Sequence, residues 1–110
     1  MGSRIAERMN DLALALRERY RDTENSQDLD EAVDLAKQAA AASAIDGLTH
    51  AGHVNNLATA LSERYERDGD PADLVAAIER FSEALTAAAN RPVEASGYAT
   101  KQSRDEDLNE

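Results

Sequence analysis

The chain has 110 residues, which is enough for one domain with a single buried core. Glycine and proline are scarce, and β-branched and aromatic residues are few, so the composition favours helices and argues against strands. With 22 acidic against 12 basic residues the net charge is -10, which argues against nucleic acid and anionic membranes as partners.

The sequence contains no cysteine, which excludes disulfides, thiolate metal ligands and cysteine nucleophiles together. No apolar run approaches the roughly 20 residues of a membrane span, and no signal segment opens the chain. We therefore expect a cytoplasmic protein that does not bind membranes. Residues 1–3 resemble a cloning remnant, so the chain is expected to be part of a longer protein.

The first two predicted helices span residues 4–22 and 29–44. Apolar residues recur at steps of three and four through both ranges, which is typical of amphipathic helices. Asp28 is expected to begin the second helix, because Glu31 follows it at the spacing of a capping box. Asp46 and the glycine after it are expected to end this helix.

The third and fourth predicted helices span residues 50–67 and 71–89. Thr49 is the expected cap of the third helix. Gly69 is expected to close that helix in a left-handed conformation, and Asp70 to cap the next one.

An internal repeat with an offset of 45 residues relates the two helix pairs. Eight of the eleven residues at 10–20 are identical to their counterparts at 55–65. A fixed period in this range indicates repeats that bury their apolar faces against one another. We therefore expect two helical hairpins, at residues 4–47 and 49–90, as one domain.

A third copy of the repeat fails after residue 90. The positions that would match the apolar residues Leu57, Ala58 and Leu61 of the second copy are Gln102, Ser103 and Glu106, which are all polar. Residues 91–110 are therefore predicted to form either a polar capping helix or a disordered tail.

The apolar pattern of the second repeat resembles that of the tetratricopeptide repeat family. The matching residues are Val54, Leu57, Ala58, Leu61, Ala77, Phe81 and Ala84. The first repeat matches too, with Ala36 at the usual aromatic position. The period exceeds the usual 34 residues. The string Asn-Asn-Leu-Ala at 55–58 resembles the first helices of kinesin light chain repeats. The longer string from Asn55 through Tyr65, with Gly69-Asp70 and Asp73-Leu74 after it, looks more like the long-period repeats of bacterial and fungal proteins, some of which carry CHAT protease domains. This implies an all-α fold, a fragment of an α-α superhelix.

The resemblance also implies a peptide-binding groove along the first helix of each repeat. The candidate residues are Asn10, Leu14, Arg17, Asn55, Asn56, Thr59 and Ser62. Amide side chains suit this role, because each can donate and accept hydrogen bonds with a peptide backbone. The alternative for each asparagine is plain solvation on an exposed helix face. The neighbouring pairs Glu18-Arg19 and Glu63-Arg64 are interpreted as solvated faces with weak ion pairs.

His50 and His53 are the only histidines, and their spacing puts both on one side of a helix. A metal site there is a weak alternative, because no third ligand is close in the sequence. We expect two exposed histidines, no metal and no cofactor, with mild pH sensitivity as a further alternative. No nucleophile with a base, and no phosphate-binding loop, can be assembled, so no enzymatic activity is predicted.

The predicted function is protein–protein interaction: an adaptor or scaffold that binds a peptide segment of a partner. The negative charge favours a basic or neutral partner over an acidic one. Two alternatives stay open. The chain could self-associate as a homo-oligomer, since two repeats bury little surface. It could also be a regulatory segment of a larger protein with a fused catalytic domain, by family analogy alone.

Overall fold

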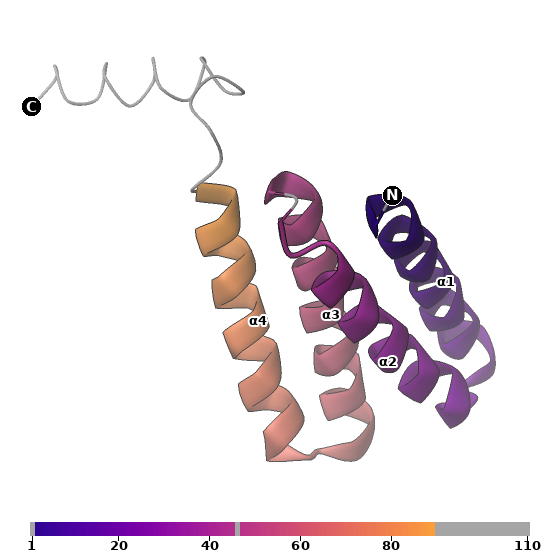
Figure 1. Cartoon of the computed structure of the whole chain (residues 1–110). Helices are drawn as coiled ribbons and strands as arrows, with labels where there is room; N and C mark the ends of the chain where they lie inside the picture. The colour runs from indigo at the N-terminus through magenta and orange to yellow at the C-terminus, as the bar shows by residue number, and fades with distance from the viewer. Residues whose placement is uncertain (1, 46, 90–110) are drawn as a thin grey trace, which may run out of the picture.

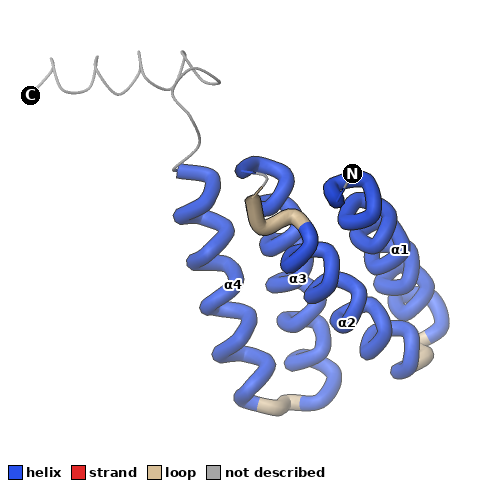
Figure 2. The backbone as a smooth tube through the Cα atoms, viewed as in Figure 1, coloured by secondary structure: helices blue, strands red, loops and turns tan. Residues whose placement is uncertain are grey.

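The computed structural model describes residues 2–45 and 47–89 of the chain. This part consists of four helices and contains no strand (Figures 1 and 2). The helices are α1 (Gly2–Thr23), α2 (Ser26–Ala42), α3 (Gly47–Asp68) and α4 (Pro71–Ala89). The prediction of an all-α fragment of helical repeats is confirmed. The predicted cap or tail at 91–110 lies outside the described residues.

The turn of the first hairpin begins α2 earlier than predicted. Glu24 adopts a left-handed conformation with φ of 59° and ends α1. Asn25 is the N-cap of α2, and its Oδ1 accepts a hydrogen bond from the Gln27 amide at 3.0 Å. Asp28 therefore lies inside the first turn of the helix rather than at its start. The prediction of Asp28 as the cap is wrong, because its carboxylate is engaged by an arginine of α1.

The turn of the second hairpin agrees with its sequence signals. Gly69, the counterpart of Glu24 in the repeat, has φ of 70°, and its amide donates to the Tyr65 carbonyl at 2.6 Å. Asp70 caps α4 by accepting a hydrogen bond from the Ala72 amide at 3.0 Å. Pro71 is the first helical residue, where proline loses no hydrogen bond. The predicted start of this helix at residue 71 is confirmed.

The connection between the hairpins differs from the prediction. The second helix ends at Ala42, and the capping residue Ser43 donates its amide to the Ala39 carbonyl at 3.1 Å. The third helix already begins at Gly47, which has φ of 38°. Thr49 therefore lies inside α3 and is not its cap.

The core is built from small side chains between closely packed helices. Helix α1 packs along α2, α3 packs along α4, and α2 also packs against α3, which joins the two hairpins. The buried cluster consists of Ala13, Leu16, Ala32, Val33, Ala36, Ala40, Val54, Leu57, Ala60, Leu61, Ala77 and Ala84. Because most of these are alanines, the helix axes can approach closely. None of the described helices has the length and apolar character needed to cross a membrane.

Candidate protein-interaction site

The predicted groove residues line two helices that lie next to each other. Asn10, Leu14 and Arg17 occupy one side of α1, and the remaining candidates lie along α3. We call the surface formed by these seven residues the α1/α3 face. Three side-chain hydrogen bonds join α1 to α3 here, and residues of this face donate two of them. The Asn56 amide donates to Asn10 Oδ1 at 3.0 Å, and Arg17 Nε donates to Glu63 Oε1 at 2.6 Å.

Arg17 helps to hold the two hairpins together. It is only 6% exposed, and Glu63 pairs with it through one carboxylate oxygen and with Arg21 through the other, at 3.0 Å. Glu63 therefore bridges α3 to α1, and the prediction that it belongs to a solvated face is wrong. Because the Arg17 side chain is buried and paired, it is a poor ligand for a partner's carboxylate.

Other members of the α1/α3 face are accessible. Leu14 and Asn55 are exposed, and no hydrogen bond of the Asn55 side chain is present among the described residues. The Thr59 hydroxyl donates to the Asn55 carbonyl of its own helix at 3.0 Å, and Ser62 is half-buried. By contrast, Asn10 is buried and bonded. The α1/α3 face thus combines hydrogen-bonded side chains, which join the helices, with the exposed side chains of Asn55 and Leu14.

Acidic residues flank this face on α1. Glu7, Asp11 and Glu18 are all exposed, and with Leu14 they recur at steps of four, three and four along one side of the helix. A row of like charges creates a local negative potential that attracts basic ligands and repels acidic ones.

Arg19 and Arg64 form a pair of equivalent contacts that the sequence interpretation missed. Arg19 donates two hydrogen bonds to Asp28 at 2.7 and 2.8 Å, and Arg64 donates two to Asp73 at 3.0 Å each. The hydrogen bond from Arg19 lowers the pKa of Asp28. Each arginine joins the two helices of its hairpin across the turn. The prediction of a solvated face is wrong for Arg64, which is 22% exposed, whereas Arg19 is 63% exposed and ion-paired, as predicted. The recurrence of aspartate nine residues after each arginine is the signal that could have revealed the two contacts.

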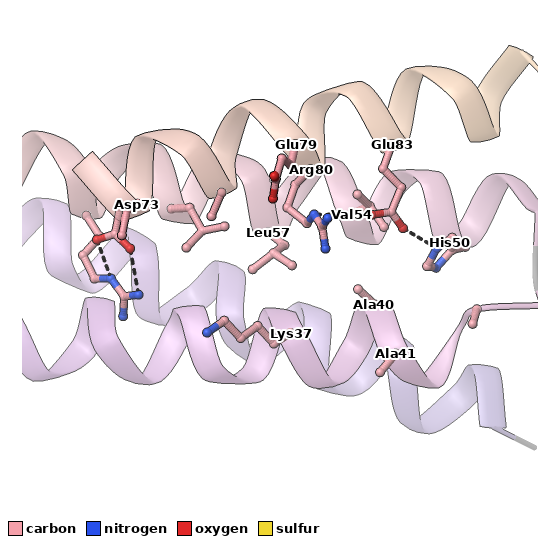
Figure 3. A pocket seen from close by; sticks show the side chains of 15 residues that line it. Lys37, Ala40, Ala41, His50, Val54, Leu57, Asp73, Glu79, Arg80 and Glu83 are labelled. Atoms are coloured by element: carbon pink, nitrogen blue, oxygen red, sulfur yellow. Dashed lines mark hydrogen bonds and ion pairs between the residues drawn. The ribbon is translucent and has the colours of Figure 1, made fainter. Parts of the chain in front are cut away.

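A groove lies between α2 and α4, away from the predicted face (Figure 3). It encloses about 650 Å³. Val54, Leu57 and Leu61 of α3 contribute apolar lining, and small residues of α2 such as Ala40 and Ala41 line another side. Charged residues of α2 and α4 complete the lining: Lys37, Glu79, Arg80 and Glu83. Its volume falls in the range of ligand pockets.

The two histidines are held inside the structure rather than exposed, contrary to the prediction. His53 is buried, and its Nδ1 lies 3.0 Å from Ser43 Oγ. The Ser43 hydroxyl also lies 2.9 Å from the Ala39 carbonyl, to which it donates. His50 lies 3.4 Å from Ser43 Oγ and 3.3 Å from Glu83 Oε2. No group of three residues that could hold a metal ion occurs in the described ranges.

Comparison with known proteins identifies the first hairpin. Residues 5–41, which cover most of α1 and α2, match the family model described as tetratricopeptide repeat. No curated protein and no solved structure matches the chain. The second hairpin repeats the plan of the first in its left-handed turn residue, its helix cap and its arginine–aspartate ion pair. The chain therefore contains a tetratricopeptide repeat and is, in general terms, a protein–protein interaction module.

Proposed function

We propose that the α1/α3 face binds an extended segment of a partner protein, and that the chain acts as an adaptor. The observation that supports this most directly is the pair of bridges between the hairpins, from Asn56 to Asn10 and from Arg17 to Glu63. They hold two helices side by side while Asn55 stays exposed. A surface that is ordered before binding loses less conformational entropy when its ligand arrives.

The chemistry of the face favours a basic or neutral peptide. The Asn55 amide can donate to a backbone carbonyl and accept from a backbone amide, which would tolerate many sequences. Leu14 offers an exposed apolar side chain on α1. The acidic row on α1 adds attraction for lysine and arginine side chains. An acidic C-terminus is disfavoured, because Arg17 is buried and its guanidinium is hydrogen-bonded to Glu63.

The proposal can be tested with a peptide that is selected from a random display library for binding to the wild-type chain. Its Kd, measured by fluorescence anisotropy, should rise about 2- to 10-fold in Asn55→Ala, since one net hydrogen bond is lost. Gln38→Ala removes an exposed amide from α2 and is the matched control, for which the Kd should not change.

The opposite pattern would overturn the proposal. If Asn55→Ala and Leu14→Glu leave the Kd unchanged while Lys37→Glu in the α2–α4 groove weakens binding, the peptide docks in that groove instead. A regulatory role beside a fused catalytic domain stays a prediction of the family resemblance.

A further inference from the structure

Helix α4 carries an apolar stripe that the described part of the chain leaves uncovered. Leu74, Ile78, Phe81 and Leu85 recur at steps of four, three and four, so they lie along one side of the helix. They are between 37% and 73% exposed. We call these four residues the α4 stripe. A continuous exposed apolar surface of this kind marks an interaction site.

The first hairpin shows what covers the same surface in the repeat. The counterparts of the α4 stripe, 45 residues earlier on α2, are Leu29, Val33, Ala36 and Ala40. Each of these is 8% exposed or less. Helix α3 packs against α2, and α4 has no helix after it in the described ranges. The stripe is therefore the surface on which an α3-like helix would pack.

The side of α3 that faces α2 can be identified from its polar contacts. His53, near one end of α3, bonds to Ser43 at the end of α2, and Arg67, near the other end, bonds to Asp30 at 2.8 Å. Between them, Leu57 and Ala60 lie on the same side of the helix and are buried. These residues form the packing row of α3.

The same row on α1 has no partner among the described residues. The counterparts of His53, Leu57 and Ala60 are Arg8, Leu12 and Ala15, and all three are exposed. Leu12 is 48% exposed, against 4% for Leu57. Nearby Ile5 is exposed as well. We call Arg8, Leu12 and Ala15 the α1 row. One molecule thus presents both halves of the α2–α3 joint, on α4 and on α1.

We propose that the α1 row of a second copy of this chain packs on the α4 stripe, so that copies associate head to tail. The contact continues the packing that already joins α2 to α3. It is heterologous, since two different surfaces meet, and it can therefore extend beyond a dimer. This self-association is independent of peptide binding, because Leu12 and Phe81 lie outside the α1/α3 face.

The charges near the two surfaces favour the same orientation as in the α2–α3 joint. In that orientation the beginning of α1, with Arg4 and Arg8, approaches the end of α4. The last turn of α4 contains no basic residue. The carbonyl end of a helix carries partial negative charge, which cations stabilise.

One feature of the internal joint is not reproduced between copies. In the internal joint, Arg67 of α3 pairs with Asp30 of α2. The counterpart of Arg67 on α1 is Asp22, and the counterpart of Asp30 on α4 is Val75, so no ion pair can form there between copies. The joint between copies therefore depends on apolar contacts between two molecules that each carry a net charge of -10. Association should strengthen when salt screens this repulsion.

Analytical ultracentrifugation of the full chain across about a hundredfold range of concentration tests the proposal. The average mass should rise with concentration, and more steeply at higher salt. Leu12→Glu and Phe81→Glu should each weaken association about tenfold or more, because each places a charge in the apolar joint. Gln38→Glu adds the same charge at an exposed residue of α2, outside both surfaces, and should associate as the wild type does.

A mixture of the two weakened variants gives the sharpest readout. Leu12→Glu keeps its α4 stripe and Phe81→Glu keeps its α1 row, so an equimolar mixture should form a one-to-one dimer that grows no further. This recovery also shows that both variants are folded.

A second experiment introduces, between copies, the ion pair that is present only in the internal α2–α3 joint. Asp22→Arg combined with Val75→Asp recreates the Arg67–Asp30 contact between copies and should tighten association about 2- to 10-fold.

Three results would overturn the proposal. A wild-type chain that stays monomeric at every concentration would show that something other than a second copy covers the stripe, such as residues 91–110 or another protein. Self-association that survives Leu12→Glu but not Phe81→Glu would mean that α4 pairs with α4. No gain from the ion-pair transfer would contradict the proposed register.

Discussion

Arginines at equivalent positions of the two repeats join the two helices of each hairpin. Arg19 and Arg64 each hold an aspartate in the first turn of the next helix through two parallel hydrogen bonds. Bidentate pairs of this kind combine charge with fixed geometry, which a lysine could not reproduce. The two repeats therefore share an arginine–aspartate ion pair as well as an apolar pattern.

The Arg19–Asp28 ion pair predicts a pH dependence at Asp28. Its pKa lies below the ordinary 3.8 because Arg19 hydrogen-bonds to the carboxylate. The stabilisation is therefore fully present above pH 3.8 and is lost as the pH falls through the lower pKa of the folded state. NMR titration of the carboxyl carbon should show this low pKa in the wild type and a value closer to 3.8 in Arg19→Gln.

The control for this titration is Arg8→Gln, which removes an exposed arginine elsewhere on α1. It should leave the pKa of Asp28 unchanged. An equal pKa in Arg19→Gln and the wild type would show that the ion pair does not form in solution.

At the scale of the elements, the turns explain where the sequence signals succeed and where they mislead. Gly69 and Asp70 give one unambiguous helix end and helix start. In the first hairpin, Asn25 and Asp28 are both acceptable caps, three residues apart. The structure uses Asn25, since Asp28 is held by Arg19. The start of α2 therefore depends on the contact between Arg19 and Asp28, which the types of the two possible cap residues do not reveal.

Two glycine-to-alanine substitutions, one in the second turn and one inside α3, test whether the turn residue has the left-handed conformation. Gly69→Ala should lower the free energy of unfolding by about 1 kcal/mol, because an L-residue is strained at φ of 70°. Gly52→Ala, inside α3, should raise it by about 0.5–1 kcal/mol, since alanine is the better helix former and its Cβ meets nothing within 4 Å. Urea unfolding followed by circular dichroism measures both. Equal effects of the two substitutions would contradict the left-handed turn.

At the scale of the whole molecule, polar side chains fasten the two hairpins to each other. Arg67 of α3 donates to the Ser26 carbonyl at 2.9 Å and to Asp30 at 2.8 Å, both on α2. Arg17 and Glu63 make the equivalent connection between α1 and α3. These contacts surround an apolar joint that is made largely of alanines, so they contribute specificity as well as stability.

Removal of the Arg67 contacts should loosen the joint. Arg67→Ala should lower the free energy of unfolding by about 1–2 kcal/mol, because hydrogen bonds to a carbonyl and a carboxylate are lost. Arg21→Ala is the comparison and should cost less, since Arg21 is half-exposed and its ion pair is screened by water. Urea unfolding monitored by circular dichroism provides both values, and a larger effect for Arg21 would contradict this account.

The sequence by itself determined the four helices of residues 2–89, their order, the second turn and the offset of 45 residues. These features depend on neighbours within one or two helical turns, and such short-range preferences are readable from residue types. The offset also pairs each residue of one repeat with its counterpart in the other, because the two copies align without a gap.

Only the tertiary structure decided which polar side chains are free and which apolar surface is uncovered. The sequence predicts Arg17 and Asn10 as ligands, but partners 46 residues away engage both of them. The apolar patterns of α2 and α4 are nearly alike, yet α3 covers the first and no described helix covers the second. The reason is physical: burial and pairing depend on which elements meet in space, which a pattern along one helix does not contain.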